Sequence, residues 1–311
     1  MLASEIAAAL NYEIIGSDLD VGRITWWNCA KEKDIAVARN KRELMDSMSQ
    51  VVLTEPVIVH TDKTLLITHE TIEYSMVRIC KLLANNGDMI DYSLPTNYYE
   101  TKQKYFIGKD CIIDKSAVIQ PGVKIGDYVS IGPNCVIEPD VFIGSGTKLV
   151  SNIYIGSGSR IGTASFYHYY NNDLLGQFNG YGTVKIGAGT VIGSNTVIQR
   201  GTMADTIIGT NNMIGNCIDI GHDVQIGDNC KIVSQTGIAS DAIIKNNVTI
   251  YGQVGVSNKV VIGNNVVVKG KTIVTKSVAD DEVIYGPFGR RYSDEMKLMA
   301  KVRLFLNRKD V

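Results

Sequence analysis

Histidine is the side chain best suited to proton transfer near neutral pH, and the sequence has four: His60, His69, His168 and His222. His60 and His69 lie near predicted strand ends within the first hundred residues, where surface or structural histidines are common. His222 follows Gly221 at a predicted corner, so we expect its ring to point outward from the packed interior. An imidazole there could accept a proton from a reacting group.

Six cysteines offer a second kind of chemistry, which the sequence argues against. No Cys-x-x-Cys pair occurs. Cys111, Cys135 and Cys230 take the inward small-residue position of a six-residue repeat, which favours small core residues over a reactive thiol or metal ligand. A chain of this size needs no disulfide, and its start lacks a basic leader, so we expect a cytoplasmic protein with reduced thiols.

The repeat organises most of the chain. An aliphatic residue returns at every sixth position from Ile107 to Ile161, again from Ile186 to Ile198, and without a break from Ile208 to Val274. A six-residue period suits neither a helix nor a hairpin. It predicts a short strand and a corner, three of which close one 18-residue coil. The expected fold is mostly β: a parallel β-helix of roughly eight coils at ~4.8 Å spacing.

The remaining segments differ in composition. Residues 1–100 lack the repeat and predict a small α+β domain, with a helix capped by Ser4, strands at 51–53, 57–60 and 65–68, and a helix at 71–84. The β-helix is expected at 101–285, followed at 286–311 by a C-terminal helix capped by Ser293. A net charge of −1 gives no reason to expect nucleic-acid binding, and no apolar run is long enough to cross a membrane.

An insertion at 163–184 interrupts the repeat. It is rich in aromatic residues: Phe166, Tyr167, Tyr169, Tyr170, Phe178 and Tyr181. Such an excursion must pack on its own coil, on a neighbouring subunit or on a ligand, and the last two are compatible.

The 18-residue length of one coil places polar residues directly above His222. Ser240 lies 18 residues further on and Asn258 lies 36 further on, with Lys259 beside it. One and two coils correspond to ~5 and ~10 Å. The sequence therefore predicts a polar strip that could hold a narrow, elongated ligand.

Several stretches resemble the UDP-3-O-(3-hydroxyacyl)glucosamine N-acyltransferases of lipid A synthesis: 159–162 (SRIG), 199–201 (QRG), 205–209 (DTIIG), 220–222 (IGH) and 285–287 (YGP). The order of the parts is similar as well. The resemblance implies a left-handed β-helix and transfer of an acyl group to the amine of a nucleotide-linked amino sugar. We also expect a homotrimer, because a triangular prism has three flat faces and a ligand that needs walls on two sides finds the second on a neighbouring subunit. It implies no tightly bound cofactor or metal, because the acyl donor is the thioester of coenzyme A or of acyl-carrier-protein phosphopantetheine.

The resemblance also implies roles for individual residues. His222 matches the catalytic base, and Ser240 matches a position, glycine in the family, whose backbone N–H stabilises the oxyanion. Phe166 matches an aromatic of a protruding loop, and Asn40 matches an asparagine that contacts uracil. Three positions depart from the family: Glu43 replaces a uracil-stacking aromatic, Gln199 replaces an aspartate, and Lys259 replaces a donor-side histidine.

These departures leave other functions open. One is a sibling enzyme that acylates another UDP- or dTDP-amino sugar for surface polysaccharide. Another is a non-catalytic structural or nucleotide-sensing trimer. A zinc hydratase on the same fold needs three converging imidazoles, whereas the repeat and its insertion hold only His168 and His222. The basic excess in the terminal helix suggests a docking surface for an acidic carrier protein. The sequence does not single out an acidic partner for His222: Asp205 and Asp241 both lie within about one coil, and neither is preferred.

Overall fold

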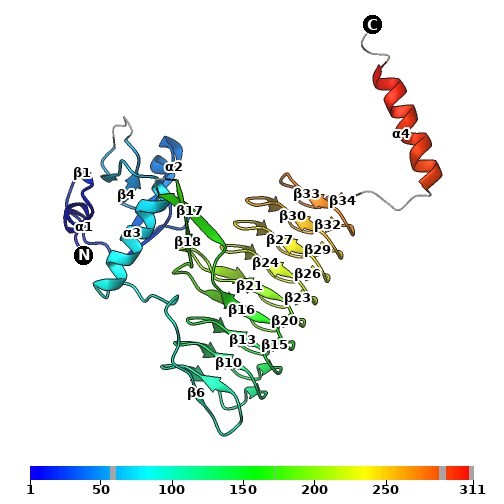
Figure 1. Ribbon diagram of the computed structural model, residues 1–311, viewed down its shortest axis with the longest axis horizontal. Helices are drawn as coiled ribbons and strands as arrows, with labels where there is room; N and C mark the ends of the chain where they lie inside the picture. Colours follow the sequence, from blue (N-terminus) through cyan, green and yellow to red (C-terminus); the bar gives the residue numbers. More distant parts are fainter. Residues whose placement is uncertain (57–60, 172, 287–291, 308–311) are drawn as a thin grey trace.

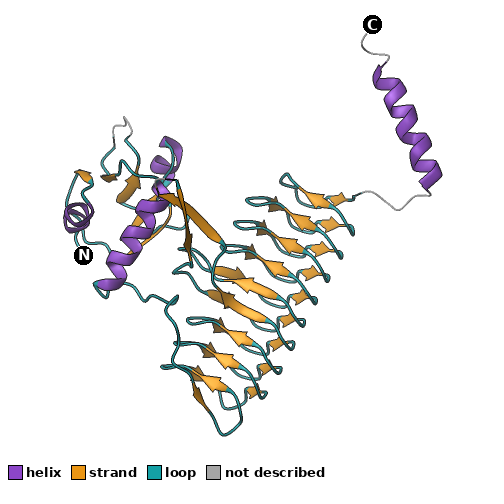
Figure 2. Ribbon diagram, viewed as in Figure 1, coloured by secondary structure: helices purple, strands orange, loops and turns teal. Residues whose placement is uncertain are grey.

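The structure is a computed structural model that describes residues 1–56, 61–171, 173–286 and 292–307. The strand expected at 57–60 lies outside these residues. The described chain forms an N-terminal domain, a tapering stack of β coils and a separate terminal helix (Figures 1 and 2).

The N-terminal domain is a five-stranded sheet with three helices. Its elements are α1 (Ala3–Leu10), β1 (Glu13–Ile15), β2 (Arg23–Trp26), β3 (Asp34–Val37), α2 (Lys41–Asp46), β4 (Val51–Thr54), β5 (Thr64–Ile67) and α3 (Ile72–Asn85). The strand order is β1-β5-β4-β3-β2, and only β1 pairs antiparallel within that sheet. The predicted cap of α1 is wrong: the helix begins at Ala3, and Ser4 inside it bonds to Asp18 instead.

Three long sheets form the walls of the coil stack. The first contains β6 (Tyr99–Glu100), β7 (Phe106–Ile107), β10 (Lys124–Ile125), β13 (Phe142–Ile143), β16 (Arg160–Thr163), β21 (Val197–Gln199), β24 (Asp219–Ile220), β27 (Gly237–Ile238), β30 (Gly255–Val256) and β33 (Ile273–Val274). The second contains β8 (Ile112–Ile113), β11 (Ser130–Ile131), β14 (Lys148–Leu149), β19 (Val184–Ile186), β22 (Thr206–Ile208), β25 (Gln225–Ile226), β28 (Ile243–Ile244) and β31 (Val261–Ile262).

The third sheet contains β9 (Val118–Ile119), β12 (Val136–Ile137), β15 (Tyr154–Ile155), β20 (Val191–Ile192), β23 (Met213–Ile214), β26 (Lys231–Ile232), β29 (Thr249–Ile250), β32 (Val267–Val268) and β34 (Val283–Ile284). Apart from β6, which pairs antiparallel with β7, every pairing in these sheets is parallel. The predicted parallel β-helix is therefore confirmed, with eight or nine stacked parallel strands on each face.

The corners repeat one backbone conformation. From Asn211 to Lys271, each sixth residue has a positive φ, between 54° and 63°. Asparagine and aspartate tolerate this left-handed region better than most residues, and they occupy many of these positions. The aliphatic residue of each repeat points inward, and Cys135 and Cys230 are buried among these side chains as predicted.

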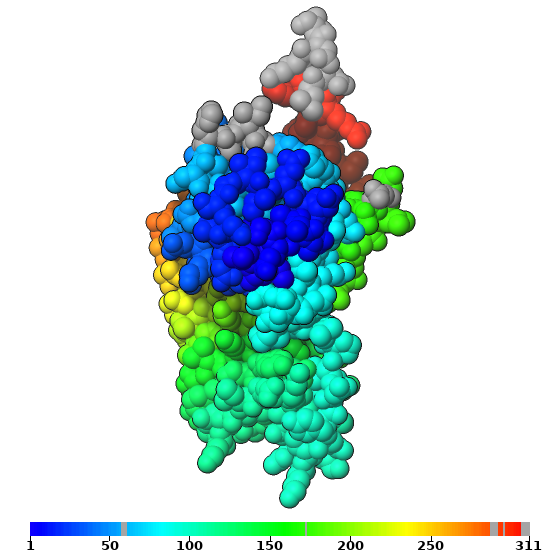
Figure 3. Space-filling view, turned by 90° about the vertical axis from the view of Figure 1, so that its left-hand side faces the viewer, coloured from blue at the N-terminus to red at the C-terminus, as the bar shows by residue number. Residues whose placement is uncertain are grey.

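The insertion forms a hairpin, β17 (Tyr167–Asn171) and β18 (Leu174–Phe178), that rises against the N-terminal domain (Figure 1). Phe178 and Tyr181 join the core of that domain, and the ring of Tyr169 stacks on Tyr74 at 5.7 Å. The insertion thus packs on the chain's own first domain. That domain stands in front of the coil stack when the molecule is viewed from its side (Figure 3).

The terminal helix α4 spans Tyr292–Asn307 and stands away from the coils (Figure 1). Ser293 lies inside it, so the predicted cap at Ser293 is wrong. Lys297, Lys301 and Arg303 are exposed on it. None of the helices in the described parts of the chain is long and apolar enough to cross a membrane.

The close stacking of the coils gives a prediction for Gly132. A Cβ there would overlap the carbonyl oxygen of Val150 on the next coil, and neither backbone can yield alone. Overpacking of this kind costs about 1–3 kcal/mol, so Gly132→Ala should lower Tm by several degrees in a calorimetric scan. Gly255→Ala is the matched control, because a Cβ at Gly255 meets open space. Equal Tm values for the two variants would contradict the tight stacking at Gly132.

Candidate active site at the corner between the first and second sheets

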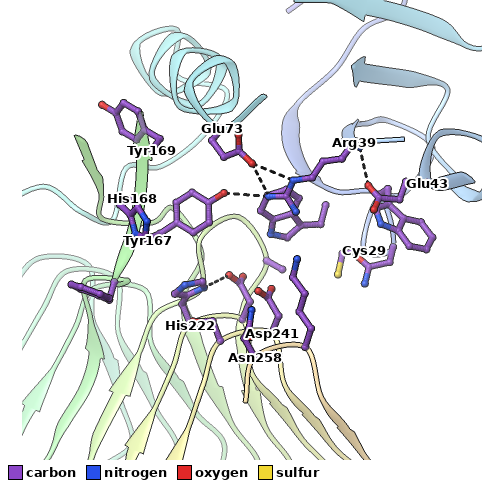
Figure 4. A pocket seen from close by; sticks show the side chains of 18 of the residues that line it. Cys29, Arg39, Glu43, Glu73, Tyr167, His168, Tyr169, His222, Asp241 and Asn258 are labelled. Atoms are coloured by element: carbon purple, nitrogen blue, oxygen red, sulfur yellow. Dashed lines mark hydrogen bonds and ion pairs between the residues drawn. The ribbon is translucent and has the colours of Figure 1, made fainter. Parts of the chain in front are cut away.

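A cavity of about 660 Å³ lies where the N-terminal domain and the hairpin meet the corner between the first and second sheets (Figure 4). His222 sits at its floor, just after β24, and residues from the next two coils stack above it. The N-terminal domain supplies the opposite wall, chiefly Trp26, Trp27, Arg39, Glu43 and Glu73.

His222 is held by the residue that follows it. Its Nδ1 lies 2.8 Å from Oδ2 of Asp223, and both side chains are buried. A carboxylate can only accept, so Nδ1 carries the proton and Nε2 is left as the basic nitrogen. The expectation of a solvent-facing ring needs correction: the ring leaves the coil, but Tyr167 covers it edge-on at 5.6 Å.

Asp223 is itself fixed by an irregular loop. The backbone N–H of Thr202 donates to its carboxylate at 3.0 Å, and the Thr202 hydroxyl donates at 2.6 Å. The Asp223 N–H in turn donates to the Thr206 hydroxyl. Asp223 is therefore the acidic partner of His222, whereas Asp205 is engaged with Thr183. In the sequence, the feature that could have indicated this partner is that Asp223 directly follows His222.

A polar network connects the hairpin to the N-terminal domain above His222. Arg39 donates to Glu73 at 3.0 Å and to the Tyr167 hydroxyl at 3.4 Å, and its guanidinium lies 4.6 Å from the Trp26 ring centre. Burial, with the nearby charge of Glu73, raises the pKa of Tyr167, so the phenol stays neutral. These contacts hold Tyr167 over the imidazole.

A second carboxylate faces the cavity one coil above the first. Asp241 donates its backbone N–H to the His222 carbonyl at 3.1 Å, and its φ of 60° matches that of Asp223. Burial and the charge of Asp223 raise the pKa of Asp241, although His222, Lys259 and Arg39 act in the opposite direction. The corner thus concentrates negative charge beside a base.

The structure gathers most of the residues singled out in the sequence. Ser240, Asn258, Lys259 and Phe166 line the cavity with His222. Asn40 and Gln199 do not: Asn40 caps α2 by accepting from the Glu43 N–H, and Gln199 accepts from the Phe166 N–H.

The aromatic wall was not foreseen. Trp26 and Trp27 are the chain's two tryptophans, and both line the cavity. The two tryptophans are adjacent in the sequence, but they lie outside the six-residue repeat, so its period could not place them near His222. In the described residues, no cluster of three or more histidine, cysteine or acidic side chains is arranged to hold a metal ion.

Known proteins with similar sequences and folds carry names of one enzyme class, the acyltransferases. The family model described as bacterial transferase hexapeptide (six repeats) matches residues 104–139. The chain carries the transferase hexapeptide repeat. It is 35% identical over 133 residues to a Sinorhizobium fredii protein named UDP-3-O-acylglucosamine N-acyltransferase, which covers 42% of this chain and 30% of that protein.

A Francisella tularensis protein named UDP-3-O-acylglucosamine N-acyltransferase 1 is 30% identical over 159 residues, covering 41% of this chain and 46% of that one. The predicted resemblance is thus confirmed, although the chain spans less than half the length of the curated relatives it matches. Among solved structures, UDP-N-acetylglucosamine acyltransferase from Campylobacter jejuni is similar at 19% identity and a TM-score of 0.48, over 57% of this chain and 70% of that one. That likeness is too low to carry an inference about function.

The position of Asp241 predicts a pH-dependent gain in stability on its removal. A pKa raised by folding means that the charged carboxylate costs more in the folded state. The charged Asp241 therefore destabilises the folded chain fully at any pH above its pKa in the folded state. The destabilisation disappears once the pH falls below the pKa of an aspartate in the unfolded chain, about 4. Asp241→Asn should therefore raise Tm at pH 8 and leave it nearly unchanged at pH 3.5, measured in matched buffers. Asp281→Asn, on an exposed corner, is the control; a lower Tm for Asp241→Asn at pH 8 would contradict the pKa direction.

Proposed function

We propose that this protein is an acyltransferase of lipid A synthesis that moves an acyl group from a thioester to the amine of a nucleotide-linked amino sugar. The observation that carries the proposal is the Asp223–His222 pair, which leaves Nε2 as a base in a cavity of ligand size. The sequence matches to UDP-3-O-acylglucosamine N-acyltransferases supply the reaction class.

The reaction needs one base and one oxyanion donor. The amine nitrogen attacks the thioester carbonyl carbon, forming the C–N bond, while Nε2 of His222 takes the amine proton. The negative charge on the carbonyl oxygen is stabilised by the backbone N–H of Ser240, which makes no hydrogen bond to the described residues. The C–S bond then breaks, and the imidazolium returns its proton to the departing thiolate. Asp223 stabilises the imidazolium through Nδ1.

The acceptor nucleotide is proposed to lie against the N-terminal wall. Glu43 cannot stack on a base, but Trp27 lines the same cavity and offers a ring face. Phe166, exposed on the hairpin edge, and Asn258 and Lys259, two coils above His222, flank the remaining opening. Asn40 and Gln199 would then act indirectly, Asn40 by capping α2 beside Glu43 and Gln199 by holding the Phe166 backbone.

The acyl donor is proposed to be a phosphopantetheine thioester on an acyl carrier protein or coenzyme A. Lys297 and Lys301 are exposed one helical turn apart on α4, and Arg303 is exposed further round the helix; this basic excess suits an acidic carrier protein.

A homotrimer is proposed from the third sheet, whose outward face carries an apolar stripe. Val118, Val136, Tyr154, Val191 and Met213 occupy successive register positions on it, and all of them except the half-buried Val136 are at least 36% exposed. A contiguous apolar patch on a protein surface often marks an interface with another protein subunit.

The trimer proposal predicts that the stripe is essential for assembly. Tyr154→Glu with Met213→Glu should give monomers in multi-angle light scattering at micromolar concentration, while the unaltered chain gives three times that mass. Lys124→Glu, an exposed position on the first sheet and outside the stripe, should remain trimeric as a charge control. A fully active monomer of the unaltered chain would contradict the proposal.

The catalytic proposal predicts a large loss of turnover for two variants. His222→Ala should lower kcat by ~10²–10⁴ with little change in substrate affinity, because the base acts only during reaction. Asp223→Asn should have a similar effect, since an asparagine N–H facing Nδ1 forces the proton onto Nε2. Both residues are buried, so Tm is measured alongside kcat. Activity within fivefold of the unaltered chain, for a folded His222→Ala protein, would exclude His222 as the base.

The acceptor proposal predicts that nucleotide sugar quenches tryptophan fluorescence. The chain's only two tryptophans line the cavity, so a UDP-amino sugar bound there should quench the signal saturably. Trp27→Phe should remove most of the quenching and raise KM, whereas Trp26→Phe should retain it, because Trp26 is covered by Arg39. Unchanged quenching in Trp27→Phe would show that the nucleobase of the ligand does not stack on Trp27.

A further inference from the structure

Trp26, the last residue of β2, reaches from the N-terminal domain into the loop that follows Arg200. Its Nε1 lies 3.3 Å from Oγ1 of Thr202, across 176 residues of sequence. An indole N–H can only donate, so the Thr202 hydroxyl is the acceptor. Thr202 is fully buried, so water competes little for this hydrogen bond.

The proton of the Thr202 hydroxyl points the other way, toward Asp223. Oγ1 of Thr202 lies 2.6 Å from Oδ2 of Asp223, and a carboxylate oxygen accepts. The same Oδ2 also accepts from Nδ1 of His222 at 2.8 Å. The hydrogen bonds therefore form one chain, which connects the indole of Trp26 through Thr202 and Asp223 to the imidazole of His222. Because a hydroxyl that accepts a hydrogen bond donates its own more strongly, the indole strengthens the contact with Asp223.

The ring of Trp26 contacts the other support of the imidazole. The guanidinium of Arg39 lies 4.6 Å from its centre, and Arg39 donates to the hydroxyl of Tyr167, the residue that covers His222 (Figure 4). The ring centres of Trp26 and Tyr167 are 6.5 Å apart. Trp26 is thus connected to His222 by its indole N–H through Asp223 and by its ring face through Tyr167.

The loop that carries Thr202 depends on the N-terminal domain for its position. Residues 200–205 belong to neither β21 nor β22, and Met203 is buried in the core of the N-terminal domain. We propose that Trp26 is a positioning residue for the base: its indole N–H fixes the Thr202 hydroxyl on Asp223, so that His222 is correctly oriented only while the N-terminal domain is packed against the coils. The inference rests on the proposed function for the role of His222 as base.

The kinetic test removes one part of the chain at a time. Trp26→Phe keeps a ring beside Arg39 but has no N–H, and it should lower kcat ~3–10-fold while KM stays within twofold. Thr202→Val removes the hydroxyl and should lower kcat ~10–100-fold, the range for a lost hydrogen bond to a charged group. Thr202→Ser should retain at least half of kcat. Thr236→Val, which removes a fully buried hydroxyl bonded to backbone carbonyls elsewhere in the coils, should keep kcat within twofold.

A double variant tests the route. In Thr202→Val the hydroxyl that Trp26 supports is gone, so adding Trp26→Phe should lower kcat by less than a further twofold. Losses that multiply would show that Trp26 acts through Arg39 and Tyr167, and would overturn the hydrogen-bond chain.

A signal from the imidazole makes the test independent of acyl transfer. In proton NMR spectra, the Nδ1 proton of His222 should give a low-field resonance that is absent from His222→Ala. This proton should exchange with solvent at least tenfold faster in Trp26→Phe and in Thr202→Val than in the unaltered chain or in Thr202→Ser. Tm is measured alongside, and Trp26→Phe carries the test if Thr202→Val does not fold.

The outcomes separate this inference from the proposed function. Exchange at the unaltered rate in folded Trp26→Phe, or kcat within twofold of the unaltered chain, would overturn the positioning role. The predicted exchange pattern in a chain that transfers no acyl group would contradict the proposed function and still support the orientation of His222 by Trp26.

Discussion

The hydrogen bonding between successive coils is the interaction on which the rest of the structure depends. From Asn211 to Lys271, each corner residue in the left-handed region donates its N–H to the coil before it, as Asp241 does to His222 and Lys259 does to Ser240. Residues one coil apart are therefore held at ~5 Å in fixed register. Asp223, Asp241 and Lys259 share this corner position, which is why three charges stack along one edge of the cavity.

A regular stack alone would leave that edge open to solvent. The two interruptions of the repeat change this: the hairpin brings Tyr167 over His222, and the loop after Arg200 brings Thr202 to Asp223. Both interruptions also contact the N-terminal domain, since Phe178, Tyr181 and Met203 join its core. The irregular segments thus bury the His222–Asp223 pair and seat the domain that forms the opposite wall.

The features that follow the six-residue repeat could be predicted from the sequence. The six-residue spacing gave the parallel coils, and steps of 18 residues placed Ser240 and Asn258 above His222 in the cavity. It did not reveal that Asp223 orients His222, because an aspartate at a left-handed corner is common throughout the repeat. The burial of His222 and the tryptophan wall were missed for a different reason. Tyr167, which covers the imidazole, belongs to the insertion, and Trp26 meets Thr202 across 176 residues of sequence, and no local pattern encodes such packing.

The central claim is that the cavity joins an acyl group to an amino sugar. The most direct measurement is the mass of the products after the chain is incubated with UDP-3-O-acylglucosamine and other nucleotide amino sugars, each with a short or a long acyl thioester. The account predicts one product heavier by a single acyl group, in amide linkage stable to mild base, formed at least ~10²-fold more slowly with Asp223→Asn. Free fatty acid without acylated sugar, or no product from any pair while the nucleotide sugar still binds, would contradict it.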